Sequence, residues 1–427
     1  MKITLYILCS LLSIVKIFGQ DKKIDWLKQH AIVLHLEDST DQFVRDKDAL
    51  KKAIGDSKLI LLGEETHGDG KAFETKGNLI KFLHEELGFS VLAFESSLYL
   101  AEKSNQSMSS SADRMSTLRG STYPHWSWTV EMQPLLQYIT DKATSENPLQ
   151  ISGFDYQAIS KVDREGFPIE LFKISRAKNI PFADQSEQND YFIFYSYLSN
   201  YFTNVPNDIT PETMQSLLHT FTSVSEKFLL GLENDDSDAG KLITQTLRNQ
   251  VDAAPSLVEN FTAKRTGKNF SSNTLRDSIM AENVIWLKEK RYPNEKIIIW
   301  AANSHNARNI NKTMGDYLFK KYGHDLYSVA FVANDGEWGT INMKNSRPIT
   351  EAKEDTFENL FHRTGYRDFF LDFRELKNMN NGKWLSEERI MRPHGYFEQT
   401  QNWTEVYDAV IFNGTMTRSH LFKVSKD

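Results

Sequence analysis

Two carboxylates and an imidazole lie close together in residues 63–68, which read GEETHG. The apolar run 58–62 before them predicts a strand, and the amphipathic stretch 70–87 after them predicts a helix with a glycine C-cap. Side chains in the loop after a parallel strand line the ligand crevice of an α/β sheet, so these groups are placed for chemistry. His67 can hydrogen-bond to Glu64, which fixes its tautomer and leaves the other ring nitrogen as a general base. The alternative is that these side chains only cap the helix.

A third carboxylate, Glu95, ends the next strand along the chain, which we expect over 90–95. Because this strand is otherwise apolar, as buried parallel strands are, its terminal charge needs a partner. The helix between the two strands carries Glu74, a candidate for substrate binding, and Lys76 in its first turns. One β-α-β unit therefore gathers the groups of the first loop with Lys76 and Glu95.

A second histidine follows another buried strand. The strand predicted over 296–301 leads into Asn303 and His305. A single histidine at such a place is usually structural, but two at one edge of a sheet favour a shared site. We therefore expect His305 to act in catalysis beside His67, and Asn303 to bind the substrate.

Two further stretches supply candidate substrate contacts. The aromatic segment 123–128 includes Trp126 and Trp128 and predicts a cleft wall, although such segments also form plain core. The helix expected over 274–290 places Arg276 on a polar stripe that reaches the site if it faces inward. The alternative for this stripe is a solvated face with local ion pairs.

The rest of the chain predicts an α/β fold. A region from about 165 to 265 lacks strand patterns and reads as helices. We therefore predict a mainly parallel sheet flanked by helices, with a helical insertion or cap. The remaining strands are expected over 149–155, 326–333, 368–372 and 405–412.

Composition indicates where the protein works. Residues 1–20 combine Lys2, an apolar centre and a glycine near their end, which is typical of a cleaved secretory signal. A membrane anchor is the alternative, but Lys16 interrupts the apolar run before it reaches the roughly 20 residues that a bilayer requires. The single cysteine, Cys9, lies in the same segment, so a mature protein has no thiol nucleophile. We expect a periplasmic or secreted protein without stable membrane association.

Charge and missing motifs exclude several functions. The formal net charge is −7, and no basic cluster is interleaved with aromatic residues, so we expect no nucleic acid partner. The chain has no G-x-S-x-G elbow, no G-x-x-x-x-G-K and no G-x-G-x-x-G after a strand. Histidines and carboxylates are left, and such groups either bind a divalent metal or activate water directly. The residues leave these two options open and do not indicate an oligomeric state.

Several short blocks stand in a characteristic order: G-E-x-x-H-G at 63–68, F-E at 73–74 and 94–95, W-x-x-E at 128–131, G-F-D at 153–155, R-D-x-x-M-A-E-N at 276–283 and S-H at 304–305. In these blocks the chain resembles the erythromycin esterase family. The resemblance implies one erythromycin esterase-like domain over 21–427. It also implies a hydrolase that opens the macrolactone ring of macrolide antibiotics without a serine nucleophile, an obligatory metal or another cofactor.

The resemblance further assigns roles to residues. His67 matches the family's water-activating base, with Glu64 and Glu95 as its acidic companions. His305 matches the second active-site histidine. Lys76 stands where several members have arginine, which keeps the charge but loses the bidentate fork, so either Lys76 or His305 is left to hold the oxyanion. The implied partner is a small-molecule macrolide, whose cationic amino sugar suits surplus carboxylates around a cleft.

Two other classes of protein stay open. One is an exported protein that binds a metal or haem on the same α/β core. The other is a metal-dependent hydrolase of another ester or of a phosphodiester, with four residues as ligands: Glu64, His67, Glu95 and His305.

Overall fold

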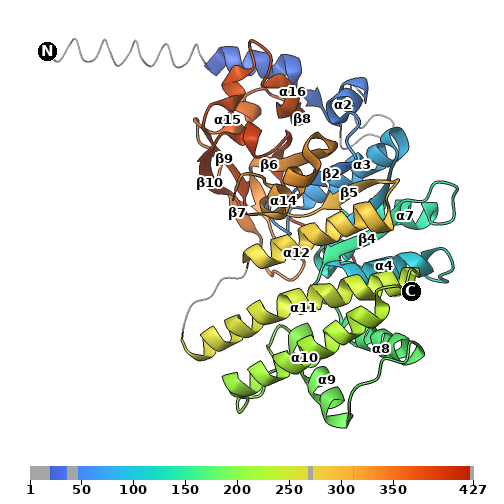
Figure 1. The fold of residues 1–427 in the computed structure, drawn as a ribbon. Coiled ribbons are helices and arrows are strands. Elements are labelled where there is room, and N and C mark those ends of the chain that lie inside the picture. Colours follow the sequence, from blue (N-terminus) through green and yellow to red (C-terminus); the bar gives the residue numbers. More distant parts are fainter. Residues whose placement is uncertain (1–19, 36–46, 268–272, 311, 424–427) are drawn as a thin grey trace.

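The computed structural model describes residues 20–35, 47–267, 273–310 and 312–423 (Figure 1). All but the last residue of the predicted signal, including Cys9, lie outside these ranges. The first described residues, 20–30, form a helix. None of the helices in the described part of the chain has the length and apolar character to cross a membrane.

A mixed, mostly parallel sheet forms the centre of the molecule. Its strands are β1 Ile32–Val33, β2 Leu59–Leu62, β3 Phe89–Ser97, β4 Gln150–Asp155, β5 Lys296–Trp300, β6 Leu326–Trp338, β7 Arg347–Ile349, β8 Asp368–Asp372 and β11 Ala409–Met416. Within the described residues these nine strands run in the order β1-β8-β11-β6-β2-β5-β3-β4, with β7 paired to β6. Neighbours from β11 to β4 pair in parallel, whereas β1, β7 and β8 pair antiparallel. The predicted α/β class with a mainly parallel sheet is confirmed.

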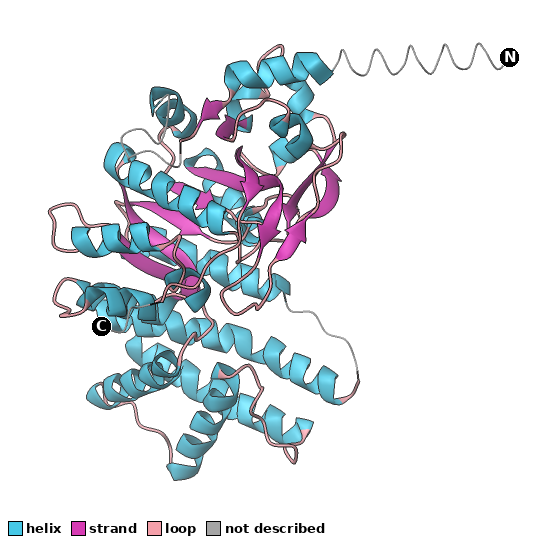
Figure 2. Cartoon of the chain, turned by 180° about the vertical axis from the view of Figure 1, so that it is seen from behind, coloured by secondary structure: helices cyan, strands magenta, loops and turns pink. Residues whose placement is uncertain are grey.

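Helices lie on both sides of the central sheet (Figure 2), and alternating residues of its strands belong to different core clusters. In β2, Leu59 and Leu61 belong to one core cluster, and Ile60 and Leu62 belong to the other. Burial on both faces is what a continuously apolar parallel strand predicts. One layer contains α2 Lys47–Ile54, α3 Gly70–Leu87 and α7 Gln133–Lys142. The opposite layer contains α4 Leu98–Met108, α12 Asn273–Trp286 and α14 Met314–Tyr322.

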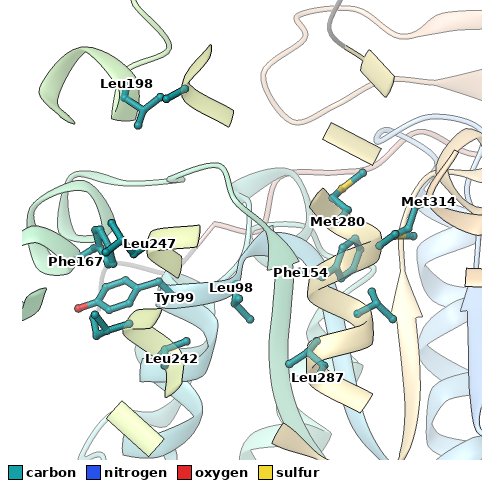
Figure 3. Close-up of a cluster of buried hydrophobic side chains, with 14 of the residues drawn as sticks. Leu98, Tyr99, Phe154, Phe167, Leu198, Leu242, Leu247, Met280, Leu287 and Met314 are labelled. Atoms are coloured by element: carbon teal, nitrogen blue, oxygen red, sulfur yellow. The ribbon is translucent and has the colours of Figure 1, made fainter. Parts of the chain in front are cut away.

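A helical region follows β4 in the chain and is drawn in green in Figure 1. It contains α8 Lys161–Ala177, α9 Gln185–Ser199, α10 Pro211–Leu232 and α11 Asp238–Arg265. Phe167 of α8 and Leu242 and Leu247 of α11 belong to the same buried cluster as Leu98 and Tyr99 of α4 (Figure 3). The region is therefore packed onto the sheet domain through one continuous apolar core.

Shorter elements complete the fold. The short helices are α5 Arg114–Gly120, α6 Pro124–Ser127, α13 Asn303–Asn306, α15 Phe357–His362 and α16 Phe373–Leu376, and a π-helical turn over Leu287–Arg291 extends α12. Strands β9 Arg389–His394 and β10 Phe397–Gln401 form a separate antiparallel hairpin.

The candidate residues lie at or just after the carboxyl ends of strands that are neighbours in the sheet. The order β2-β5-β3-β4 places the loop after Leu62, the helix α13 after β5, Glu95 near the end of β3 and Asp155 at the end of β4 along one edge. Parallel strands bring their carboxyl ends to the same side of a sheet. The fold thus collects residues from four distant parts of the chain.

Gly63 occupies a point where no side chain fits. Its amide donates a hydrogen bond to the carbonyl of Val329 at 2.9 Å, which starts the first loop directly beside β6. A Cβ at this position would lie 1.8 Å from Oδ1 of Asn303, whose side chain is fully buried. The glycine is therefore required by close packing.

We expect Gly63→Ala to lower the free energy of unfolding by roughly 2–4 kcal/mol, because the loop or the buried Asn303 must move. Gly77→Ala in α3 is the matched control. Its Cβ would stand 3.5 Å from Leu135, an ordinary contact distance, and alanine favours the helix by roughly 0.5–1 kcal/mol. Chemical denaturation of both variants measures the difference, and equal stability would contradict the packing described for Gly63.

Candidate active site

Glu64 is the centre of a buried relay that joins α3 to the first loop. Nδ1 of His67 lies 2.7 Å from its Oε1, and because a carboxylate only accepts, Nδ1 carries the proton. Nζ of Lys76 lies 2.5 Å from its Oε2. The side chains of Glu64 and Lys76 are 0 % exposed, whereas that of His67 is 37 % exposed. The relay therefore presents one imidazole to solvent from a buried ion pair, with Nε2 as the nitrogen that can take a proton.

Aromatic side chains enclose this relay. Nε1 of Trp126 donates to Oε1 of Glu64 at 3.1 Å, and its indole lies edge-on to His67 at 5.3 Å between ring centroids. Nζ of Lys76 lies 4.0 Å from the ring centroid of Trp300. Trp126 is 1 % exposed, so the structure places it as a support for Glu64 and not as the open cleft wall that the sequence suggests.

The second glutamate of the loop, Glu65, lies among other neighbours, which include Asp69 and Glu358. It is buried, and burial together with the charges of Asp69 and Glu358 raises its pKa well above the ordinary value. Its carbonyl accepts a hydrogen bond from the amide of Gly395 at 3.1 Å, which ties the loop to the β9–β10 turn. Only one of the two adjacent glutamates therefore contacts the imidazole.

A second charged cluster lies at the ends of β3, β4 and β5. Oε1 of Glu95 is 2.9 Å from Nη2 of Arg276 and 3.4 Å from Nε2 of His305. Oδ2 of Asp155 is 2.5 Å from the same guanidinium nitrogen. Nδ1 of His305 is 2.8 Å from Oδ1 of Asp277. Arg276 of α12 thus faces inward, which excludes the solvated-face alternative for this residue.

Nearby carboxylates raise the pKa of both histidines. Burial lowers the pKa of His305, but Glu95 and Asp277 outweigh it and raise the pKa to about 10. Burial also opposes the protonation of His67, yet its hydrogen bond to Glu64 and the charge of Glu95 raise its pKa above 6.5. His305 therefore holds its proton at neutral pH, and its positive charge acts against protonation of His67.

Three further residues were predicted to bind substrate. Asn303 is fully buried, and its side chain makes three hydrogen bonds to backbone groups of β6 and β9. Trp128 packs against the guanidinium of Arg119, which is 4.8 Å from its ring centroid. Glu74 is exposed on α3. Asn303 and Trp128 therefore have packing roles in this structure, because their polar or aromatic groups are already engaged within the protein.

Two acidic residues of the cluster were not among the predicted site residues. Asp155 is the last residue of β4, and Glu95 lies near the end of β3. An acidic residue at the end of an apolar strand occurs twice in the sequence, and this repeated pattern could have identified Asp155. Asp277 lies next to Arg276 in the sequence, but its contact with His305 depends on the placement of α12 beside α13. No local pattern gives that placement.

A cavity of about 1180 Å³ opens beside His305. The start of α12 and the β9–β10 hairpin contribute to its walls, and its size suits a large ligand. Most of its lining side chains are polar, so the ligand meets many hydrogen-bonding groups: Thr274, Arg276, Asp277, Ser304, His305, Ile310, Lys312, Thr313, His394, Gln399, Thr400 and Gln401.

The buried carboxylates of the site each lie beside a cation. Lys76 pairs with Glu64, and Arg276 pairs with both Glu95 and Asp155. One guanidinium faces two carboxylates in the second cluster, and the surplus negative charge expected around a cleft for an amino sugar stays a prediction. In the part of the chain that the structure describes, no group of three or more His, Cys, Asp or Glu residues is arranged to hold a metal ion.

Comparisons with known proteins agree with this architecture. Residues 84–415 match the family model for erythromycin esterase. A relative from Bacillus subtilis, "Putative hydrolase YbfO", is 26% identical over 428 residues, which cover 93% of this chain and 92% of the relative. The family match begins within α3, so it includes Glu95, Arg276 and His305 but not the loop that carries His67.

Solved structures share the fold along nearly the whole chain. A Bacillus cereus protein is 19% identical with a TM-score of 0.73, and the match covers 95% of this chain and 99% of that one. A mutant of erythromycin esterase EreC in its open conformation is 14% identical with a TM-score of 0.66, and the match covers 92% of this chain and 99% of that one.

The family match and the Bacillus subtilis relative support a hydrolase. The family model spans most of the chain, and the matched part contains the second charged cluster. This protein belongs to the erythromycin esterase family.

Proposed function

We propose that this protein hydrolyses the macrolactone ester of macrolide antibiotics, using water that His67 activates, and thereby confers macrolide resistance. The observation that carries the proposal is the buried relay from Lys76 through Glu64 to His67, beside a second histidine that holds its proton. Family membership supports the reaction class. The shared fold with an erythromycin esterase supports the choice of substrate to test first.

His67 acts as the general base in this mechanism. Because its Nδ1 is bonded to Glu64, Nε2 takes a proton from a water molecule as the water oxygen attacks the ester carbonyl carbon. Glu64 stabilises the imidazolium that forms, and Lys76 keeps Glu64 ionised and fixed in place. The product of this step is a tetrahedral intermediate with a negatively charged oxygen.

The oxyanion is stabilised by His305. Its two ring nitrogens face Asp277 and Glu95, so it acts on the oxyanion through its positive charge. Its side chain is 18 % exposed, which lets a bound carbonyl approach that charge. Lys76 is 0 % exposed and is held by Glu64, so we assign it no contact with the substrate. The intermediate then breaks its bond to the ring oxygen, and the leaving alkoxide takes the proton from Nε2 of His67.

Binding energy must come from a large substrate. The proposed site stores no nucleophile, so its rate depends on holding the ester carbonyl against the water, the base and the oxyanion donor. The cavity of about 1180 Å³ beside His305 offers room for a macrolide ring with its sugars. A small ester fills little of this volume and gains little binding energy.

We expect the purified protein to add the mass of one water to a 14-membered macrolide by opening the lactone, while short-chain esters react poorly. His67→Gln should lower this rate by about 10²–10⁴-fold or more, because it removes the base. Liquid chromatography with mass detection measures the product, and circular dichroism checks that the variant folds. Rapid turnover of an aryl ester or a phosphodiester without any hydrated macrolide would contradict the substrate, and an active His67→Gln variant would contradict the base.

The dependence of kcat/KM on pH should be bell-shaped. The rate should rise as pH passes the raised pKa of His67, above 6.5, because the base must be neutral. It should fall as pH passes about 10, where His305 loses the proton that stabilises the oxyanion.

Asp277→Asn removes a negative charge beside His305, so it should move the descending limb to lower pH and leave the ascending limb nearly unchanged. Rate measurements across the pH range with both proteins check this. A descending limb that does not move in the variant would exclude His305 as its source.

A further inference from the structure

We propose that His125 is a positioning residue that stacks on His67 and stabilises its protonated form during turnover. This rests on the proposed function, in which His67 takes a proton from water. The ring centroids of the two imidazoles are 4.9 Å apart, with 15° between their planes. Tyr123 stacks on His125 in turn, at 5.2 Å and 11°. Tyr123, His125 and His67 therefore form a stack of three rings.

The short helix α6 supports both halves of the catalytic pair. His125 stacks on the imidazole of His67, while the next residue, Trp126, donates its indole N–H to Glu64. The amide of Tyr123 donates to Oγ of Ser96 at 3.2 Å, which fixes the beginning of this segment to β3. The stack is thus anchored to β3 beside Glu95.

His125 has the properties of a neutral ring. Its Nε2 is buried and has no hydrogen-bond partner among the described residues, so a proton there would lack an acceptor. Burial, followed by the charge of His67, lowers its pKa to about 4. A neutral aromatic ring stacked against an imidazolium attracts it through its π electrons, whereas it has no such preference for the neutral form.

Other charges also affect the pKa of His67, so the effect of the stacked ring must be measured separately from theirs. The groups that face His67 from the surrounding elements are Glu64 of its own loop, Glu95 of β3, His305 of α13 and His125 of α6. Replacing the ring of His125 leaves the first three in place. A change in the pKa of His67 would then report the ring itself.

Two variants of similar size test the inference. His125→Phe keeps a ring and removes the nitrogens, and His125→Leu fills the space without a π system. We expect His125→Leu to lower kcat on the pH plateau by roughly tenfold, with KM changed by less than about twofold, and to lower the pKa of His67. His125→Phe should keep kcat within about threefold and retain most of the raised pKa. Steady-state kinetics with the macrolide and an NMR titration of His67 give these readouts.

The control is His30→Leu. His30 also stacks on an aromatic ring, that of Trp26 at 4.1 Å, but lies outside the contacts of the site, so neither readout should change. If His125→Leu does not fold, His125→Ala supplies the ringless variant. An unchanged pKa of His67 in the ringless variant, or a His125→Phe variant as impaired as His125→Leu, would overturn the inference. If the wild type hydrolyses no macrolide, the proposed function fails, while the NMR titration still decides the inference.

Discussion

The buried ion pair between Glu64 and Lys76 fixes the geometry on which the rest of the site depends. Neither charge is stable alone at 0 % exposure, because an unpaired buried ion costs several kcal/mol. Lys76 can reach Glu64 only because α3 begins directly after the loop and turns this residue toward the sheet, over the ring of Trp300. One carboxylate oxygen is thereby committed to Lys76, and the other is left in a fixed position for His67.

The second cluster meets the same constraint in a different way. Glu95 and Asp155 share a single guanidinium, which suits arginine because its planar fork can bond to two carboxylates at once. The side chain of Arg276 is 24 % exposed and lines the cavity, whereas that of Lys76 is fully buried. One cluster therefore holds the imidazole of His67 through a buried ion pair, and the other exposes part of a cation to the cavity. The proposed mechanism gives the two histidines different roles for this reason.

Sequence patterns predict the sheet and its edge well, because buried parallel strands and a helix with a glycine C-cap leave a strong local signal. The helix ends at Gly88 with a left-handed φ of 71°, as expected. The patterns also predict that His67 and His305 lie at one edge of the sheet, and the strand order places β2 and β5, which precede them, side by side. The spacing of three residues also selects Glu64 as the partner of His67, and the two side chains are 2.7 Å apart, but it does not show that Glu65 is buried among acidic neighbours. Nor do the patterns reveal that the side-chain amide of Asn303 is fully hydrogen-bonded to the backbone, because its partners lie on strands far away in the sequence.

The pKa values of the two adjacent glutamates shift in opposite directions, and this difference has a structural consequence for the cavity. Burial raises the pKa of Glu64, but Lys76 and His67 outweigh it and keep the carboxylate ionised, whereas Glu65 has acidic neighbours and its pKa rises. Glu65 can therefore be buried as a neutral acid beside Tyr396 in the β9–β10 turn, while its carbonyl binds the amide of Gly395. The hairpin that lines the cavity is thus attached to the loop that carries His67. In the proposed mechanism, which has no stored nucleophile, this attachment keeps the distance between the bound ester and the activated water constant.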